Sequence, residues 1–386
     1  MKILVATDQW SPDVVGGSAR VAADSARALV RRGHELLVLA PAQAGLPAVE
    51  EDDGLVVRRA FRRGPFPQTL ADPVLTRHHA RALREHSFDL LVAHQATNAV
   101  GLAAARFDVP LVLVFHASPT LELRFLRGRV TGLSRLAAYA LDPALVTLER
   151  LAFRQATGVL VLSHFSEQLV RRRHPSAAVR VVGGGVDDAF FAESPDLREC
   201  RTRLGIPDGV LLFTARRLEP RMGVDILIEA LARIDDDSVV LAVAGSGSSR
   251  GDLDRRVHEL GLRNRVRLLG QVSEDDLRSL YRAADLFVLP TVAYEGFGMS
   301  TVEALAAGTP ALGTAVGATP EILGDLGAEF IVPRAEPAAL AAAIRQVLPE
   351  LGPELRARAR RLAEKRFRWR DVICAWEQAL LDFRKG

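Results

Sequence analysis

The sequence predicts an α/β protein of two domains, each built on a doubly wound parallel β-sheet with helices on both faces. Its 386 residues exceed what one ordinary hydrophobic core holds, so two domains are expected. Short β-rich runs alternate with longer amphipathic segments along the chain, which is typical of parallel sheets. Several runs are continuously apolar, as expected for strands buried on both faces.

The first series of predicted strands occupies the N-terminal half of the chain. These strands are expected at Ile3 to Thr7, Glu35 to Ala40, Leu55 to Ala60, Leu90 to His94, Leu111 to Phe115 and Val159 to Leu162. Helical patterns fill most of the gaps. In the first gap, residues 19–32 place apolar side chains on one helix face, and Gly33 follows as the glycine that commonly ends a helix.

Three consecutive glycines mark the expected boundary between the domains. The stretch VRVVGGGVDD begins at Val179 as a strand and runs into a glycine cluster, which is typical of a linker. We therefore assign residues 1–187 to the first domain and 188–366 to the second. Strands of the second series are expected at Val210 to Ala215, Val239 to Ala244, Val266 to Leu269, Leu286 to Leu289 and Pro310 to Gly313. Residues 367–386 are expected to form a final helix that packs back onto the first domain.

The composition argues against several functions. A net charge of +3 gives no sign of a nucleic-acid binder. The only lysines lie near the termini, at positions 2, 365 and 385, so neither a phosphate-binding P-loop nor a Schiff-base lysine is available. Cys200 and Cys374 have no metal-type spacing and indicate a reducing compartment. Because no apolar run has the length of a signal peptide core or a membrane span, a cytoplasmic location is expected.

The stretch EGFGMSTVEALAAG, residues 295–308, has the pattern of a sugar and phosphate site. It follows an apolar strand, and its two glycines would let a ligand's phosphates approach bare backbone at the start of a helix. Carboxylates accept strong hydrogen bonds from sugar hydroxyls, so Glu295 could bind a hexose and Glu303 the diol of a ribose. The alternative for Glu303 is a capping box with Ser300 that stabilises the helix.

This stretch resembles the E-x7-E signature of the retaining glycosyltransferases of family 4, a family that includes glycogen synthases and mannosyltransferases. Further matches, in the family's order, are Gly16-Gly17, FH at Phe115-His116, GVD at 185–187, ARRLEPRMG at 215–223, AGSG at 244–247, ADLFVLP at 284–290 and GATPEIL at 317–323. The resemblance implies the GT-B architecture, in which two Rossmann-like domains face an interdomain cleft. It also implies a nucleoside-diphosphate sugar donor on the second domain and a hydroxyl acceptor on the first.

The resemblance also assigns roles to residues. Glu295 would contact the donor sugar, Glu303 the ribose, and the backbone amides around Phe297, Gly298 and Met299 the phosphate and sugar. His116 matches a family residue that hydrogen-bonds the transferred sugar, with a structural histidine as the alternative.

Two other features of the first domain each have a functional and a structural interpretation. Gly16 and Gly17 could let the backbone approach the donor phosphates, or could form a plain turn. His94 ends the strand beside that of His116, and a structural role is favoured for it.

One family position departs from the pattern. The family contacts the diphosphate with the Arg and the Lys of R-L-x-x-x-K-G, and these positions are Arg217 and Met222 here. A thioether holds no anion. Arg216, Arg217 and Arg221 are the local cations that could bind the diphosphate, because arginine is a bidentate phosphate donor. The alternative is that Arg216 and Arg221 are solvated loop charges.

The remaining motifs point to no cofactor. Three aspartates at 235–237 precede a strand and read as a solvated turn, so no essential metal is expected. In residues 121–135, the least regular stretch of the first domain, arginines alternate with leucines and phenylalanine. This stretch could contact the anionic inner face of a membrane. Alternatively, it could be a mobile loop near the acceptor that does not bind lipid.

The expected reaction is sugar transfer with retention, by front-face attack and without a metal, in glycan or cell-envelope biosynthesis. The expected catalytic residues are Glu295, His116 and Arg217. Replacing Glu295 with alanine is expected to cut turnover by orders of magnitude and to leave the fold intact. Alternatives are a phosphorylase or sugar epimerase with the same fold, or a catalytically idle subunit that binds sugar nucleotides.

Overall fold

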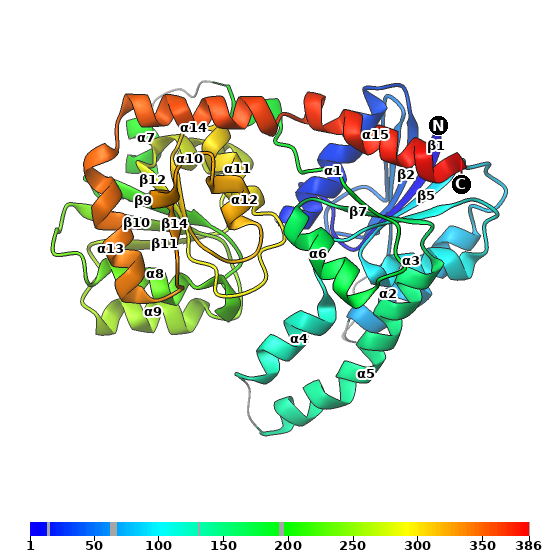
Figure 1. Cartoon of the computed structure of the whole chain (residues 1–386), viewed down its shortest axis with the longest axis horizontal. Helices are drawn as coiled ribbons and strands as arrows, with labels where there is room; N and C mark the ends of the chain where they lie inside the picture. The colour runs from blue at the N-terminus through cyan, green and yellow to red at the C-terminus, as the bar shows by residue number, and fades with distance from the viewer. Residues whose placement is uncertain (14–15, 62–67, 130–131, 193–196, 386) are drawn as a thin grey trace. The chain divides into compact units, whose positions relative to one another are not determined.

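The structure, a computed structural model, describes residues 1–13, 16–61, 68–129, 132–192 and 197–385. The chain divides into two compact units (Figure 1): Met1–Gly185 with Trp369–Gly386, here called unit 1, and Val186–Arg368, here called unit 2. The predicted boundary after residue 187 lies close to this division.

Unit 1 contains an eight-stranded sheet in the order β3-β4-β2-β1-β5-β6-β7-β8. The strands are β1 (Lys2–Thr7), β2 (Glu35–Pro41), β3 (Val49–Asp52), β4 (Leu55–Phe61), β5 (Leu90–His94), β6 (Leu111–Val114), β7 (Gly158–Val161) and β8 (Val179–Val181). All neighbours pair in parallel except β3, which pairs antiparallel with β4 at the sheet edge. The central strands are apolar and buried, which suits a sheet covered on both faces.

Seven helices lie in the described part of unit 1. They are α1 (Gly17–Val30), α2 (Gln68–Arg81), α3 (Ala96–Ala105), α4 (Pro119–Arg127), α5 (Gly132–Gln155), α6 (His164–Arg173) and α15 (Trp369–Lys385). The C-terminal helix α15 is joined to this unit by Glu377, whose carboxylate accepts a 2.7 Å hydrogen bond from Arg32 and lies 2.8 Å from Nε2 of His34. Gly185 is required for this packing, because a Cβ there would lie 2.4 Å from the Trp369 ring.

Unit 2 contains a six-stranded parallel sheet in the order β11-β10-β9-β12-β13-β14. The strands are β9 (Val210–Ala215), β10 (Val239–Ala244), β11 (Val266–Gly270), β12 (Leu286–Leu289), β13 (Ala311–Thr314) and β14 (Ile331–Val332). The helices are α7 (Leu197–Arg203), α8 (Val224–Leu231), α9 (Arg250–Glu259), α10 (Glu274–Ala283), α11 (Met299–Ala306), α12 (Thr319–Leu323), α13 (Pro337–Val347) and α14 (Pro353–Arg366). Short 3-10 turns are η1 (Asp188–Phe190), η2 (Pro220–Met222), η3 (Ala328–Phe330) and η4 (Leu348–Glu350).

The predicted class, two α/β domains with parallel sheets, is confirmed. In each sheet the chain starts at a central strand, then adds strands on one side of it, and finally adds strands on the other side. In doubly wound sheets in general, crossovers are right-handed, and ligands bind at the carboxyl ends of the strands where the order reverses. These reversal points lie between β1 and β5 in unit 1 and between β9 and β12 in unit 2.

One expectation about local structure is wrong. Residues 121–135 are not the irregular loop that the sequence suggests, because most of them belong to α4 and α5; residues 130–131 lie outside the described part of the chain. Ser118 starts α4 as its N-cap, with its side chain accepting from the Leu121 amide and Pro119 in the first turn. Figure 1 shows the two helices extending away from the unit 1 sheet.

Candidate active site

The reversal point of unit 2 gathers three polar side chains that are distant in sequence. Arg216 directly follows β9, and Thr291 and Glu295 follow β12, the neighbouring strand. The carboxyl ends of parallel neighbours lie at one sheet edge, so the fold itself brings these residues together. The Arg216 side chain is 6% exposed and the Glu295 side chain 15%.

Arg216 and Glu295 form an ion pair. Nη2 of Arg216 donates to Oε2 of Glu295 at 3.0 Å, and Nη1 donates to the Thr291 hydroxyl at 2.8 Å. The Thr291 hydroxyl in turn donates to the same Glu295 oxygen at 2.9 Å. Burial lowers the pKa of the Arg216 guanidinium, and Glu295 opposes this; an arginine nonetheless keeps its charge. The solvated-charge alternative for Arg216 is therefore wrong.

Two glycines fix the backbone on either side of this pair. A Cβ at Gly245, in the AGSG motif, would lie 2.0 Å from the Arg216 carbonyl oxygen. A Cβ at Gly317, in the GATPEIL motif, would lie 2.0 Å from the carbonyl oxygen of Glu295, which also accepts a 2.9 Å hydrogen bond from the Ala318 amide. Both glycines have positive φ, so these motifs serve close backbone packing that places the two charges.

The loop from Gly296 to Met299 presents the start of helix α11. Gly298, with φ of 96°, is the N-cap and has no side chain to accept from the first helical amides. Phe297 is buried and meets Phe367 edge to face, 6.0 Å between ring centroids. With its side chains turned inward or absent, the loop offers backbone amides and the positive end of the helix, which favour an anion.

Glu303 does not form the capping box that the sequence offers as an alternative. The helix begins at Met299, so Ser300 lies inside it, and no side chain makes a cap hydrogen bond. Instead Glu303 is buried, 4% exposed, and its Oε2 accepts a 2.7 Å hydrogen bond from the Tyr281 hydroxyl. Tyr281 is held among the rings of Phe190, Phe213 and Phe287, and so fixes the orientation of this carboxylate.

The other residues of the 215–223 motif have distinct surroundings. Arg217, the predicted catalytic arginine, is exposed. Arg221 donates to the Tyr294 carbonyl at 3.2 Å. Met222 is buried, and its Sδ lies 3.1 Å from Nη2 of Arg216. Tyr294, next to Glu295, has a φ of 58°, a strained conformation for a residue with a side chain, which is common at functional sites.

The reversal point of unit 1 holds the other predicted residues. Thr7, at the end of β1, pairs with His94, at the end of β5. Gly16 is the N-cap of α1, and Gly17 is its first residue. His116 follows β6, the next strand along the sheet.

His94 and His116 form a hydrogen-bonded pair. Nδ1 of His94 lies 2.9 Å from Nε2 of His116, and the ring centroids are 5.2 Å apart. Burial lowers the pKa of His116 from 6.5 to about 4, and burial together with His116 lowers the pKa of His94 well below 6.5. Both rings are therefore neutral at pH 7, and one must donate to the other. His94, for which the sequence favours a structural role, contacts the candidate catalytic residue His116.

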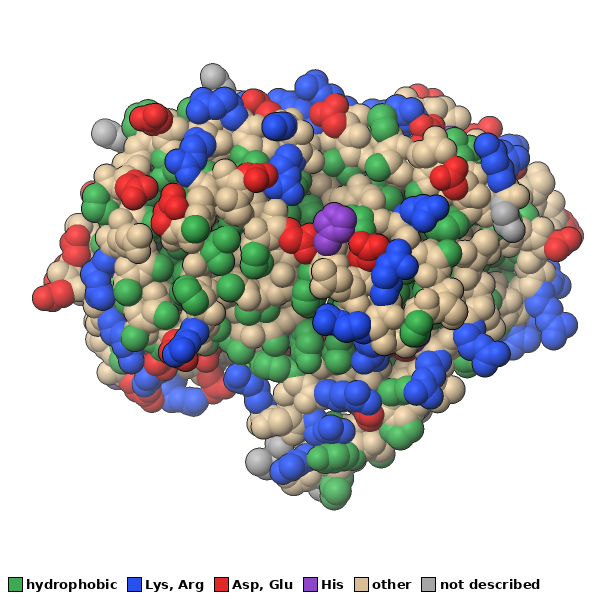
Figure 2. Space-filling view, in the orientation of Figure 1, with side chains coloured by type: hydrophobic (Ala, Val, Ile, Leu, Met, Phe, Trp, Pro, Cys, Tyr) green, Lys and Arg blue, Asp and Glu red, His purple; other side chains and the backbone are tan. Residues whose placement is uncertain are grey.

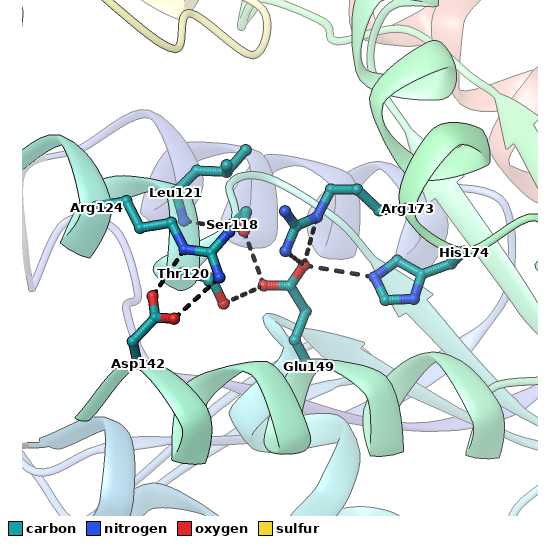
Figure 3. Close-up of polar contacts among 8 residues, drawn as sticks. All are labelled: Ser118, Thr120, Leu121, Arg124, Asp142, Glu149, Arg173 and His174. Carbon is teal, nitrogen blue, oxygen red and sulfur yellow. Dashed lines mark hydrogen bonds and ion pairs between the residues drawn. The ribbon is translucent and has the colours of Figure 1, made fainter. Parts of the chain in front are cut away.

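A buried carboxylate that sequence reasoning missed holds the segment after His116 in place (Figure 3). Glu149 of α5 is 2% exposed. Its Oε2 accepts hydrogen bonds from Ser118 and Thr120, at 2.7 and 2.9 Å, and its Oε1 accepts from Arg173 at 2.9 Å. Glu149 thus joins the first turn of α4, which begins three residues after His116, to the C-terminal end of α6.

Comparisons with known proteins match this architecture. The family Glycosyltransferase Family 4 matches residues 15–190, and Glycosyl transferases group 1 matches residues 196–366. A D-inositol 3-phosphate glycosyltransferase of Mycolicibacterium gilvum is 33% identical over 339 residues, 83% of this chain and 74% of that relative. The chain belongs to the family 4 glycosyltransferases.

Solved structures place this glycosyltransferase among GT-B enzymes. Sucrose-phosphate synthase of Thermosynechococcus elongatus superimposes with a TM-score of 0.82 at 21% identity and 99% coverage of both chains. HepE of Anabaena, solved with UDP and glucose, gives a TM-score of 0.77 at 25% identity over 99% of this chain and 100% of that one. The expected GT-B fold and the assignment as a transferase are confirmed.

Of the predicted site residues of the glycosyltransferase, the structure joins Arg216 to Glu295 in unit 2. It places Gly298 and Met299 at the start of α11, and Glu303 one turn further on. His116, Gly16 and Gly17 lie in unit 1. Sequence reasoning missed Thr291, Tyr281 and Glu149, whose contacts join segments 4, 22 and 31 residues apart, respectively.

Proposed function

We propose that the protein transfers a sugar, with retention at the anomeric carbon, from a nucleoside-diphosphate sugar held by unit 2 to a hydroxyl acceptor. The observation that carries this proposal is the Arg216–Thr291–Glu295 cluster beside the uncapped start of α11. An arginine and free helical amides suit a diphosphate, whereas carboxylates suit sugar and ribose hydroxyls. The solved complex of HepE with UDP and glucose supports a donor of this class.

The chemistry follows from charge placement. Departure of the diphosphate develops negative charge, which the arginines and the amides of residues 297–299 stabilise, so the proposal needs no metal. Oε2 of Glu295 accepts from Arg216 and Thr291, and a carboxylate that binds the distal hydroxyls of the donor sugar is poorly placed to attack its anomeric carbon. We therefore favour front-face attack, with the leaving phosphate as base, over a double displacement. A neutral His116 can donate to or accept from a sugar hydroxyl.

A ligand screen followed by product analysis tests this function. One of UDP, GDP, ADP and TDP is expected to raise the melting temperature, because a ligand at 100 times its Kd stabilises by about 2.7 kcal/mol. The corresponding nucleotide sugar is expected to give a product whose anomeric configuration, read by NMR, matches the donor.

Other outcomes of the same assay identify the alternatives. Product that forms only with inorganic phosphate indicates a phosphorylase, and an altered donor sugar indicates an epimerase. Binding with neither transfer nor slow hydrolysis indicates an idle binding subunit. Stabilisation by none of the four nucleotides contradicts the proposal.

For the acceptor side, we propose that α4 and α5 contact an anionic membrane surface. Figure 2 shows arginines and apolar side chains gathered along the part of unit 1 that these helices form. Leu126, Leu136 and Tyr139 are 39%, 65% and 48% exposed, and Arg127 lies over the Tyr139 ring at 4.1 Å. Exposed apolar groups beside arginines suit an anionic interface. No helix in the described part of the chain has the length and apolar character needed to cross a bilayer.

Vesicle flotation tests this contact. The protein is expected to float with vesicles that contain anionic lipid, less so in high salt, and not with neutral vesicles. Leu136→Ser is expected to reduce flotation several-fold. Val74→Ser is the matched control, because Val74 on α2 is 66% exposed and lies outside this surface. Equal flotation of both variants, or no flotation of the wild type, contradicts the contact.

A further inference from the structure

Unit 2 lacks the family lysine at position 222 but holds another cation close to that position. The only lysines of the chain are at positions 2, 365 and 385, and position 222 carries an uncharged methionine. The space beside Met222 nevertheless contains a cation. Nη2 of Arg216 lies 3.1 Å from Sδ of Met222 and 3.0 Å from Oε2 of Glu295.

The Arg216 guanidinium has unused hydrogen-bonding capacity. It carries five N–H donors, of which the contacts with Thr291, Glu295 and Met222 use three. Its Nε is buried and has no hydrogen-bond partner. A buried donor without an acceptor is unfavourable unless a ligand supplies one. A phosphate oxygen is a strong acceptor of the required charge.

A methionine and a lysine at position 222 would have opposite effects on the Arg216 guanidinium. Sδ of Met222 is neutral and accepts weakly, so it tolerates the guanidinium at contact distance. A lysine at 222 would bring its ammonium into the same space, where two like charges repel in a poorly solvated site. Nη1 of Arg221 also lies 3.8 Å from Sδ of Met222, so a lysine at 222 would meet two guanidinium groups.

We infer that Arg216 supplies the positive charge that meets the donor diphosphate in this protein, in the place that Met222 leaves without one. Glu295 holds the guanidinium there through Oε2. This inference rests on the proposed function, since it assigns a residue to the diphosphate of that donor. It separates two of the three predicted arginines: Arg216 lies beside Met222, whereas Arg217 is exposed.

Moving the cation from one side chain to the other tests the inference. Arg216→Met, Met222→Lys and the double variant are compared with wild type by calorimetric titration with UDP, GDP, ADP, TDP and the four matching nucleosides. Arg216→Met is expected to weaken binding of the preferred diphosphate by about 10- to 100-fold, the range for a lost charge-assisted hydrogen bond. Nucleoside binding should not change. The double variant should regain at least tenfold of the loss, whereas Met222→Lys alone should bind more weakly than wild type or melt at a lower temperature.

Each contrary result has a distinct meaning. If Arg216→Met is folded and binds the diphosphate like wild type, the inference is wrong and the proposed function stands. A double variant that regains the melting temperature without regaining diphosphate affinity shows that Arg216 only balances Glu295, which also overturns the inference. A wild type that binds none of the four diphosphates removes the proposed function itself.

Discussion

Glu295→Gln is expected to lower turnover by about two orders of magnitude, because it removes a charge-assisted hydrogen bond to the donor sugar in the transition state. The amide oxygen still accepts from Arg216 and Thr291, the partners that Oε2 has now. The fold should therefore remain intact. Initial rates with the nucleotide sugar that the ligand screen selects, together with melting curves, measure both effects.

The ion pair between Arg216 and Glu295 decides which substitution at position 295 affects turnover without affecting the fold. Glu295→Ala leaves the Arg216 guanidinium buried and unpaired, which is expected to cost about 3–5 kcal/mol of stability. Alanine therefore tests fold and function together, contrary to the expectation from sequence. Glu336→Gln, at an exposed position in the same unit, is the control and should match wild type. Near-normal turnover of Glu295→Gln would rule out a role for this carboxylate in the reaction.

Glu149→Ala is expected to destabilise unit 1 by about 3–5 kcal/mol, because it removes the carboxylate from a buried network and leaves Arg173 without it. The Ser118 and Thr120 hydroxyls also lose their acceptor. Urea unfolding of the full chain, followed by a probe in unit 1, measures the loss. Asp142→Ala is the control on the same helix: its ion pair with Arg124 is more exposed, so a loss below about 1 kcal/mol is expected. Equal losses for the two variants would contradict the account.

The stability that the Glu149 carboxylate contributes should depend on pH. Burial alone would raise the pKa of this carboxyl, but hydrogen bonds from His174 and Ser118, the charge of Arg173 and a hydrogen bond from Thr120 lower it from 4.5 to about 2. Because the pKa is lower in the folded state, the stabilisation is complete above pH 4.5 and is lost as the pH falls toward 2. The difference between wild type and Glu149→Ala should shrink over that range. A constant difference would indicate that packing, not charge, holds α4.

The strands that could be predicted are the buried apolar ones. Leu286–Leu289 of β12 is buried at every position, and such runs reveal themselves by composition. The two strands missed carry no such signal. Val49–Asp52 of β3 is a fully exposed and mostly acidic edge strand, and β14 has only two residues. They form because β4 and β13 have free edges to pair with, which no local pattern records.

The site could be predicted as motifs but not as contacts. The two glutamates and the glycines near them could be predicted because the loop and the helix that carry them are adjacent in the sequence. The pairing of Arg216 with Glu295 joins residues 79 apart, and sequence alone ranked Arg217 above Arg216. Likewise the pairing of His94 with His116 depends on β5 and β6 being neighbours in the sheet. These contacts follow from strand order, which a single sequence does not give.

The most direct test of the donor site is amide hydrogen exchange, measured with and without the nucleoside diphosphate that the screen selects. We predict slower exchange in residues 211–223 and 295–303, where Arg216, the glycine loop and the start of α11 would meet the phosphates and ribose. Stabilisation by the nucleotide with no change in these two segments, and with protection elsewhere in the chain, would contradict the account.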